Sequence, residues 1–161
     1  MTEEKPKEAP KKLEATDASE HPWVRAIRAS LPDTVLSAKE FAGQVTVTVA
    51  REAIARVARH LKEAEDFKYC VDVTAVDWKT RQPRFDVVYH FYSFSKNGRI
   101  RIKCPAGEGE EVPSIATIFL AANWCERTPH LSMSSLVNPL IPKSFSAVRP
   151  MFMVVTMSQC L

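Results

Sequence analysis

The side chains best suited to acid–base chemistry lie in one part of the chain, at Asp72, Asp77, Asp86 and His90. A general acid or base must stand within hydrogen-bond reach of the group that it serves. Asp86 and His90 share the same parity on an extended strand, but four residues along a strand span about 13 Å. Acids near strand ends commonly cap turns or pair with arginine, and we interpret these acids in that way. We therefore predict no catalytic residue on this chain.

The other residue types that bind cofactors or act as nucleophiles lack the necessary spacing. Cys70, Cys104, Cys125 and Cys160 form no C-x-x-C pair and match no zinc or iron–sulfur pattern, so we expect reduced thiols. Ser114 has no G-x-S-x-G context, and the sequence contains neither G-x-G-x-x-G nor a P-loop. The histidines without ligand spacing are His21, His60 and His130. We predict no cofactor-binding and no metal-binding residue.

Apolar periodicity predicts the elements of the first half of the chain. Trp23, Ile27 and Leu31 recur at spacing four, which predicts a short helix that stops near Pro32. Residues 44–49 alternate apolar and polar, which predicts a half-buried strand. An apolar stripe at helical spacing predicts an amphipathic helix over residues 50–61. We interpret the basic residues off that stripe as a solvated face rather than a phosphate site; they are Arg51, Arg56, Arg59 and Lys62.

The second half is expected to form three strands and a helix. Residues 68–78 are rich in strand formers, with Val71, Val73 and Ala75 on one face. Residues 85–94 are apolar on both faces, which predicts a central strand. Asn97-Gly98 predicts a type I′ hairpin turn, and residues 99–104 return with their basic side outward. After an acidic loop at 107–111, Pro113-Ser114 is expected to start a helix that runs toward Glu126. These elements predict an α+β fold, a mostly antiparallel sheet with helices packed on it.

Length and composition limit the class of protein. The 161 residues suffice for one domain with a core, and the 45% hydrophobic content is ordinary for a globular chain. No run approaches the roughly 18 apolar residues of a membrane span. Residues 1–20 are charged and have almost nothing to bury, so we predict a disordered tail. The net charge of +3 is a weak pointer to an anionic partner.

Nucleic-acid binding is the alternative that the strand aromatics suggest. Tyr89, Phe91, Tyr92 and Phe94 are of the type that stacks on bases in RNA-binding sheets. No glycine–aromatic RNA-binding pattern accompanies them, so we interpret them as core residues. A free-standing RNA-binding module stays open as an alternative function.

Five segments in order carry a resemblance to a known family. They are VDVTAVDW, RFDVVYHFYSF, RIRIK, VPSI and AANWCER, within residues 22–127. Together they resemble the 30 kDa-type subunit, also called the C subunit, of the proton-pumping NADH–quinone oxidoreductase, respiratory complex I. The equivalent subunit of a membrane-bound hydrogenase or formate hydrogenlyase is an alternative within the same family.

The resemblance implies an accessory, structural role in the respiratory chain. Such a subunit sits in the peripheral arm, against the cluster-bearing and quinone-binding subunits, on the cytoplasmic side of the bacterial inner membrane. It touches the membrane only through these partners and binds no nucleic acid. NADH, FMN, iron–sulfur clusters and a quinone such as ubiquinone belong to the partner subunits, and the sequence does not tell which quinone is used. The oxidoreductase and translocase activity belongs to the assembly.

The resemblance ends at Arg127. Residues 128–161 contain no Asp, Glu or Gly and hold four of the five methionines. Two interpretations stay open: a segment translated out of frame, or a divergent, poorly ordered tail. We therefore divide the chain into a tail at 1–20, a domain similar to the 30 kDa-type subunit at 21–127 and the divergent segment at 128–161. Glu126 and Arg127 survive from the family signature, and we expect them at an interface or in an ion pair, with a cationic partner for Glu126.

Overall fold

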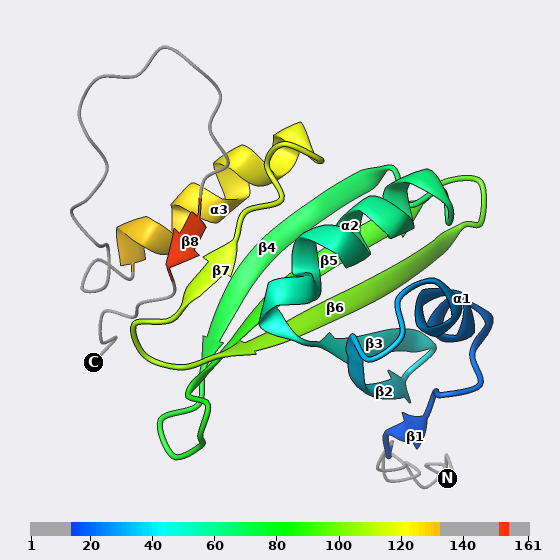
Figure 1. Cartoon of the computed structure of the whole chain (residues 1–161), viewed down its shortest axis with the longest axis horizontal. Helices are drawn as coiled ribbons and strands as arrows, with labels where there is room; N and C mark the ends of the chain where they lie inside the picture. The colour runs from blue at the N-terminus through cyan, green and yellow to red at the C-terminus, as the bar shows by residue number, and fades with distance from the viewer. Residues whose placement is uncertain (1–13, 133–151, 155–161) are drawn as a thin grey trace, which may run out of the picture.

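The computed structural model describes residues 14–132 and 152–154, and for residues 127–132 and 152–154 it describes only the backbone. Figure 1 shows the arrangement of the elements. In chain order they are β1 (Thr16–Asp17), α1 (Pro22–Ser30), β2 (Val35–Phe41), β3 (Gln44–Val49), the 3₁₀ turn η1 (Arg51–Ala53), α2 (Ile54–Glu63), β4 (Tyr69–Asp77), β5 (Phe85–Ser93), β6 (Gly98–Ala106), β7 (Glu111–Pro113), α3 (Leu120–Ser132) and β8 (Phe152–Val154).

Six strands form one sheet in the order β1-β2-β3-β6-β5-β4, and β7 and β8 pair separately. All neighbours in the large sheet are antiparallel except β3 and β6, which run parallel. Parallel neighbours need a crossover, and α2 with β4 and β5 lies between them in sequence. The predicted α+β class with a mostly antiparallel sheet is confirmed.

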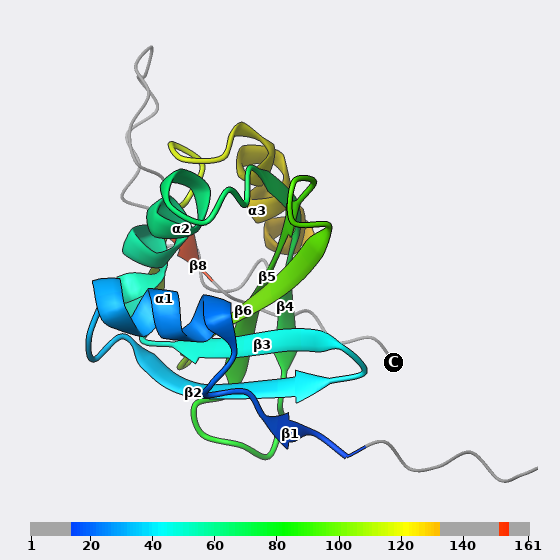
Figure 2. The same cartoon turned by 90° about the vertical axis from the view of Figure 1, so that its right-hand side faces the viewer.

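The core lies between one face of this sheet and the helices. Figure 2 shows α1 and α2 next to each other on one side of the sheet, while α3 packs against β4. Alternate residues of the strands face this core, as period-two geometry requires. The largest fully buried side chains include Phe85, Tyr89, Phe91, Ile100 and Ile102. Each contributes about 1.5–3 kcal/mol by leaving water.

The predicted hairpin between β5 and β6 is present, but its turn is not type I′. Ser93 pairs with Gly98, so four residues, 94–97, form the loop, and of the two predicted central residues only Asn97 has positive φ. The two-residue turn with positive φ at both positions lies instead between β2 and β3, at Ala42 and Gly43. Ala is uncommon at a type I′ position, which explains why the sequence pattern does not predict β2.

Gly98 serves packing rather than the turn. A Cβ built on Gly98 would lie 2.8 Å from Cζ2 of Trp23, which belongs to α1. The Trp23 ring also meets the Phe67 ring edge-on, with 5.1 Å between centroids. The missing side chain therefore lets α1 approach the start of β6 closely.

Two further predictions about local structure are wrong. The last helix begins at Leu120 and not at Pro113-Ser114, because Pro113 ends β7 and a tight turn from Ile115 to Phe119 intervenes. Val71 is 57% exposed and does not share a face with Val73. A β-bulge between Cys70 and Asp72 reverses the parity, so that Cys70 faces the core in its place.

The structure also differs from the predicted domain boundaries at both ends. Within the expected disordered tail, Thr16 and Asp17 pair with β2 and Ala18 is 4% exposed, while residues 1–13 lie outside the described residues. Helix α3 continues past Arg127 to Ser132, and β8 pairs with β7. The rest of the divergent segment lies outside the described residues, so the division at Arg127 stays a prediction, which limited proteolysis tests.

The contact between Trp23 and Gly98 predicts a steric penalty. Gly98→Ala should lower the free energy of unfolding by about 1–3 kcal/mol, the usual range for overpacking. Gly107→Ala is the matched control, because its Cβ would meet only the flexible side chain of Glu110. In a double-mutant cycle with Trp23→Ala, measured by urea unfolding, most of the Gly98→Ala penalty should disappear. An unchanged penalty would show that Trp23 is not its cause.

Candidate subunit interface

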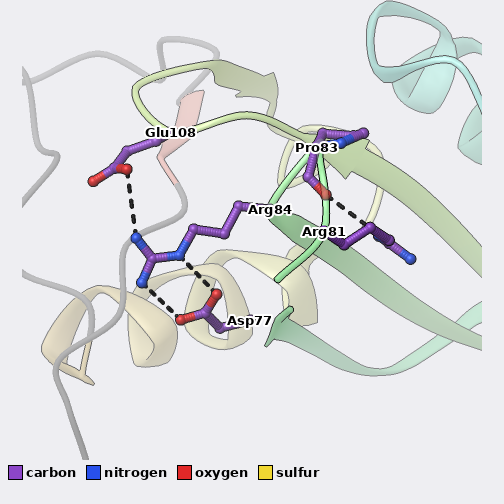
Figure 3. Close-up of polar contacts among 5 residues, drawn as sticks. All are labelled: Asp77, Arg81, Pro83, Arg84 and Glu108. Carbon is purple, nitrogen blue, oxygen red and sulfur yellow. Dashed lines mark hydrogen bonds and ion pairs between the residues drawn. The ribbon is translucent and has the colours of Figure 1, made fainter. Parts of the chain in front are cut away.

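The turn between β4 and β5 is held by a bidentate ion pair. Asp77 ends β4 and Arg84 directly precedes β5, so antiparallel pairing brings them together. Arg84 donates from Nε and Nη2 to the two Asp77 carboxylate oxygens, at 2.8 and 2.9 Å, and from Nη1 to Glu108 at 3.4 Å (Figure 3). Its hydrogen bonds hold the pKa of Asp77 below its usual value. Asp77 is thus a structural anion of the turn.

Asp86 is engaged in a second cluster at the same turn. It accepts a hydrogen bond from the indole Nε1 of Trp78 at 3.0 Å and forms an ion pair with Arg81. Arg81 also donates from Nε to the Pro83 carbonyl at 3.3 Å (Figure 3). The interpretation of Asp77 and Asp86 as arginine partners is confirmed. The sequence offers no specific signal for Arg81, because its five-residue spacing from Asp86 spans an irregular turn.

Strand pairing places His90 opposite Asp72, and not near Asp86. His90 is half-buried and its other cross-strand neighbour is Arg101. Burial, and then the positive charge of Arg101, lower the pKa of His90. Asp72 accepts a hydrogen bond from the backbone N–H of Val73 at 2.9 Å.

The remaining candidate residues are dispersed over the fold. The Nδ1 of His21 accepts the backbone N–H of Trp23 at 3.3 Å and caps α1. His60 lies in the last turn of α2, with Nε2 buried and without a partner among the described residues. In the part of the chain that the structure describes, no three His, Cys, Asp or Glu side chains come together as a metal site would need. The side chain of His130 lies outside the described residues.

Two thiols are held protonated by their surroundings. Cys70 and Cys104 are buried and free, and burial raises the pKa of each to about 12. Cys125 is free and half-buried, and Cys160 lies outside the described residues.

The basic residues of the α2 region are not all solvated. Arg51 pairs with Glu52 and Glu110, both at 2.9 Å. Lys62 donates from Nζ to the Ile118 carbonyl at 2.5 Å and so ties α2 to the turn before α3. Arg56 and Arg59 are exposed, as predicted.

Glu126 is buried inside this domain. Its side chain accepts from the Ser114 hydroxyl at 2.5 Å and from the backbone N–H of Ile115 at 2.9 Å, and the residue is 4% exposed. These two neutral donors stand where we expected a cationic partner. Burial raises the pKa of Glu126, although both hydrogen bonds oppose that effect. The Arg127 side chain lies outside the described residues, and the interface role of both residues stays a prediction.

Exposed apolar side chains gather on the sheet edge and on α3. On β4, Tyr69 is 52% exposed, and Val71 and Val76 are also exposed. Leu120 and Trp124, four residues apart on α3, are 87% and 78% exposed. Because water-facing apolar groups of this size often mark interaction surfaces, β4 and α3 are candidate contacts with other proteins.

The four strand aromatics divide between the core and the surface. Tyr89 and Phe91 are buried in the core, where Phe91 meets Phe119 at 5.1 Å between centroids. The hydroxyl of Tyr92 donates to Asn97 at 2.7 Å, and Phe94 is exposed at the hairpin. The core interpretation is confirmed for Tyr89 and Phe91 and wrong for Phe94. Tyr92 is half-buried, with its ring centroid 4.8 Å from that of Phe94 at the surface.

An α+β domain with exposed apolar side chains on β4 and α3 has a surface suited to docking onto other proteins. Residues 47–130 match the family model of the respiratory-chain NADH dehydrogenase 30 Kd subunit. The chain belongs to this family, and the predicted resemblance is confirmed.

Several C subunits of NADH-quinone oxidoreductases are similar to this chain. The one from Geotalea uraniireducens (strain Rf4) is 41% identical over 102 residues, 63% of this chain and 62% of the relative. The one from Geobacter metallireducens is 40% identical over 114 residues, 70% of each. The one from Rhodobacter capsulatus is 45% identical over 98 residues, 60% of this chain and 49% of the relative. The match to the first of these therefore spans less than two thirds of its length.

A solved structure shares the fold. A chain of the membrane-bound sulfane sulfur reductase (MBS), an archaeal respiratory membrane complex, superposes with a TM-score of 0.58 at 23% identity, covering 66% of this chain and 63% of that one. Within the described residues, no helix is both long and apolar enough to cross a membrane.

The contacts of Glu126 predict a selective loss of stability. Glu126→Ala leaves the Ser114 hydroxyl and the Ile115 N–H without their acceptor and should lower the free energy of unfolding by about 2 kcal/mol. Glu126→Gln keeps a carbonyl acceptor and should cost less. Guanidinium unfolding of the three proteins measures both differences. Equal stability of all three would contradict a structural role for the carboxylate.

The raised pKa of Glu126 also predicts a pH dependence. Protonation of Glu126 stabilises the folded state, because the pKa of this carboxyl is higher in the folded than in the unfolded chain. This stabilisation is fully present below the unfolded pKa of about 4.3. It is lost as the pH rises through the folded pKa. The difference in stability between wild type and Glu126→Gln should therefore shift against wild type as the pH rises from about 4 to about 8. A difference independent of pH would show that the folded pKa is not raised.

Proposed function

We propose that this chain is an accessory, structural subunit of the peripheral arm of NADH–quinone oxidoreductase. The observation that carries the proposal is the match to the 30 Kd subunit family over residues 47–130, with about 40% identity to several C subunits of NADH-quinone oxidoreductases. In this function the chain fixes the distance and orientation between cluster-bearing and quinone-binding subunits. Its exposed side chains on β4 and α3 are suited to such contacts.

The chemistry then belongs to the assembly. NADH, FMN, iron–sulfur clusters and quinone bind to partner subunits, and this chain contributes no ligand and no catalytic group to the ion-pumping reaction. The state of the acids supports this assignment, because Asp77 and Asp86 are held by arginines and Glu126 by Ser114 and Ile115. Through its partners the chain lies on the cytoplasmic side of the bacterial inner membrane.

An equivalent subunit of a membrane-bound hydrogenase or a related respiratory complex is the second candidate. The shared fold with a chain of the archaeal sulfane sulfur reductase complex makes this candidate reasonable. At 23% identity that likeness concerns the fold alone, and the relatives near 40% identity favour the NADH–quinone enzyme.

Affinity purification of the tagged full chain from its native membranes tests the proposal. We expect the other subunits of NADH–quinone oxidoreductase to co-purify in constant ratio, together with NADH–quinone reductase activity. Recovery with hydrogenase-type subunits would favour the second candidate. Recovery of the chain alone, under conditions in which the enzyme stays intact, would contradict both.

The chain by itself should be colourless. Purified from overexpression and passed through gel filtration, it should show no visible absorption from iron or flavin, because the cofactors reside on its partners. The intact complex is the positive control for the same spectrum. Iron or flavin bound in stoichiometric amount to the isolated chain would overturn the accessory assignment.

A further inference from the structure

The face of the large sheet opposite the helices carries more positive than negative charge. Strand register places one continuous row across it, from Asp17 through Lys39, Thr46, Arg101 and His90 to Asp72. Arg99 and Lys103 lie on the same side, two residues either way from Arg101 along β6. Within the described part, the helices pack on the other side. We call this surface the open face.

The cations of the open face are distinguished by lying together on neighbouring strands. Arg51, Arg81 and Arg84 each form an ion pair with a carboxylate of this chain. Among the described residues, none of Lys39, Arg99, Arg101 and Lys103 does so. Within the same part of the chain, Arg25, Arg56 and Arg59 on the helix side also form no ion pair.

Arg101 illustrates how little of this charge is balanced. It donates from Nη2 to the neutral amide oxygen of Gln44 at 2.5 Å, and its buried Nε has no acceptor in the described part. Carboxylates stand at both ends of its row, Asp72 on the edge strand β4 and Asp17 on the edge strand β1, and neither forms an ion pair among the described residues. The positive charges of Lys39, Arg99, Arg101 and Lys103 thus lack an ion-paired carboxylate among the described residues, which favours an anionic partner.

A hollow adjoins one end of this surface. It is about 520 Å³ in volume and lies between the β2–β3 turn, α1 and the β5–β6 hairpin. Trp23, Tyr92 and Arg99 line it, together with the backbone around Gly43 and Gly98. A single side chain of a docked segment fits such a volume, beside the cationic row.

We propose that the open face is a docking surface for an acidic segment of a neighbouring protein subunit. The inference deepens the proposed function and rests on it, since the neighbour is a subunit of the same complex. The carboxylates of the docked segment pair with Lys39, Arg99 and Lys103 and reach Arg101. Charge complementarity of this kind sets association rate, register and choice of partner. A protein segment is favoured over nucleic acid because the proposed function surrounds this chain with protein subunits. Of the strand aromatics, Tyr89 and Phe91 face the core, whereas Tyr92 lines the hollow.

Charge reversal in the full complex tests the inference. The triple variant Lys39→Glu, Arg99→Glu, Lys103→Glu spares Arg101, which is bonded to Gln44. The matched control reverses three exposed arginines on the helix side; they are Arg25, Arg56 and Arg59. Both variants change net charge equally, and circular dichroism checks that both fold.

We expect co-purification of the open-face variant with the complex to fall at least about tenfold, the loss that removal of close charge pairs brings, while the control is retained like wild type. Equal retention of both variants would overturn the inference and leave the proposed function standing. If wild-type chain fails to co-purify with any subunit of the enzyme, the proposed function fails and the inference falls with it.

Carbodiimide cross-linking of the native complex identifies the occupant, because this reagent joins lysine amines directly to carboxylates. Links from Lys39 or Lys103 to Asp or Glu of another subunit are the expected result. Links only to carboxylates of this chain would show that the chain covers its own open face and would overturn the inference. Salt-dependent binding of a single-stranded RNA oligonucleotide that is lost in the open-face variant but kept in the control would assign the surface to nucleic acid instead.

Discussion

Burial of the core-facing side of β5 is the constraint on which the rest of the structure depends. Phe85, Val87, Tyr89 and Phe91 are each at most 1% exposed, and removing so much apolar surface from water requires cover in every direction. Strands β4 and β6 satisfy the two backbone edges of β5, while the helices cover its apolar face. The turn before α3 contributes Phe119 to the same cluster, where it contacts Phe91. Even distant elements such as α1, tied to the β5–β6 hairpin through Trp23 and Gly98, are arranged around this strand.

Polar contacts then fix the irregular segments that the apolar core leaves undetermined. Arg84 closes the β4–β5 turn onto Asp77, and Lys62 joins α2 to the Ile118 carbonyl. Glu126 reaches back from α3 to the residues that follow β7, through Ser114 and Ile115. Because an unpaired buried donor costs more than a made hydrogen bond contributes, each contact acts mainly by excluding other loop conformations. Acidic residues such as Asp77, which the sequence offered as acid–base candidates, thus stabilise turns and loops.

The two sides of the sheet are chemically unlike, and this asymmetry connects the fold to its proposed function. One side meets helices through apolar residues, whereas the other presents Arg99, Arg101 and Lys103 without carboxylate partners among the described residues. An isolated domain gains no stability from like charges held close together. Under the proposed function, carboxylates of a neighbouring subunit balance these charges in the assembled complex.

Local periodicity in the sequence by itself determined β3, α2, β5, β6 and the basic side of β6. Alternation in strands and helical spacing in helices indicate which face of an element packs against the core. Only the tertiary structure decided the rest. The pairing of β2 depends on a turn at Ala42-Gly43 that carries no strong residue signal, and the bulge at Val71 arises from register with β5. The neutral partners of Glu126 and the position of His90 opposite Asp72 result from contacts between separate elements. Such contacts depend on strand order and register, and a pattern confined to a single element contains no information about either.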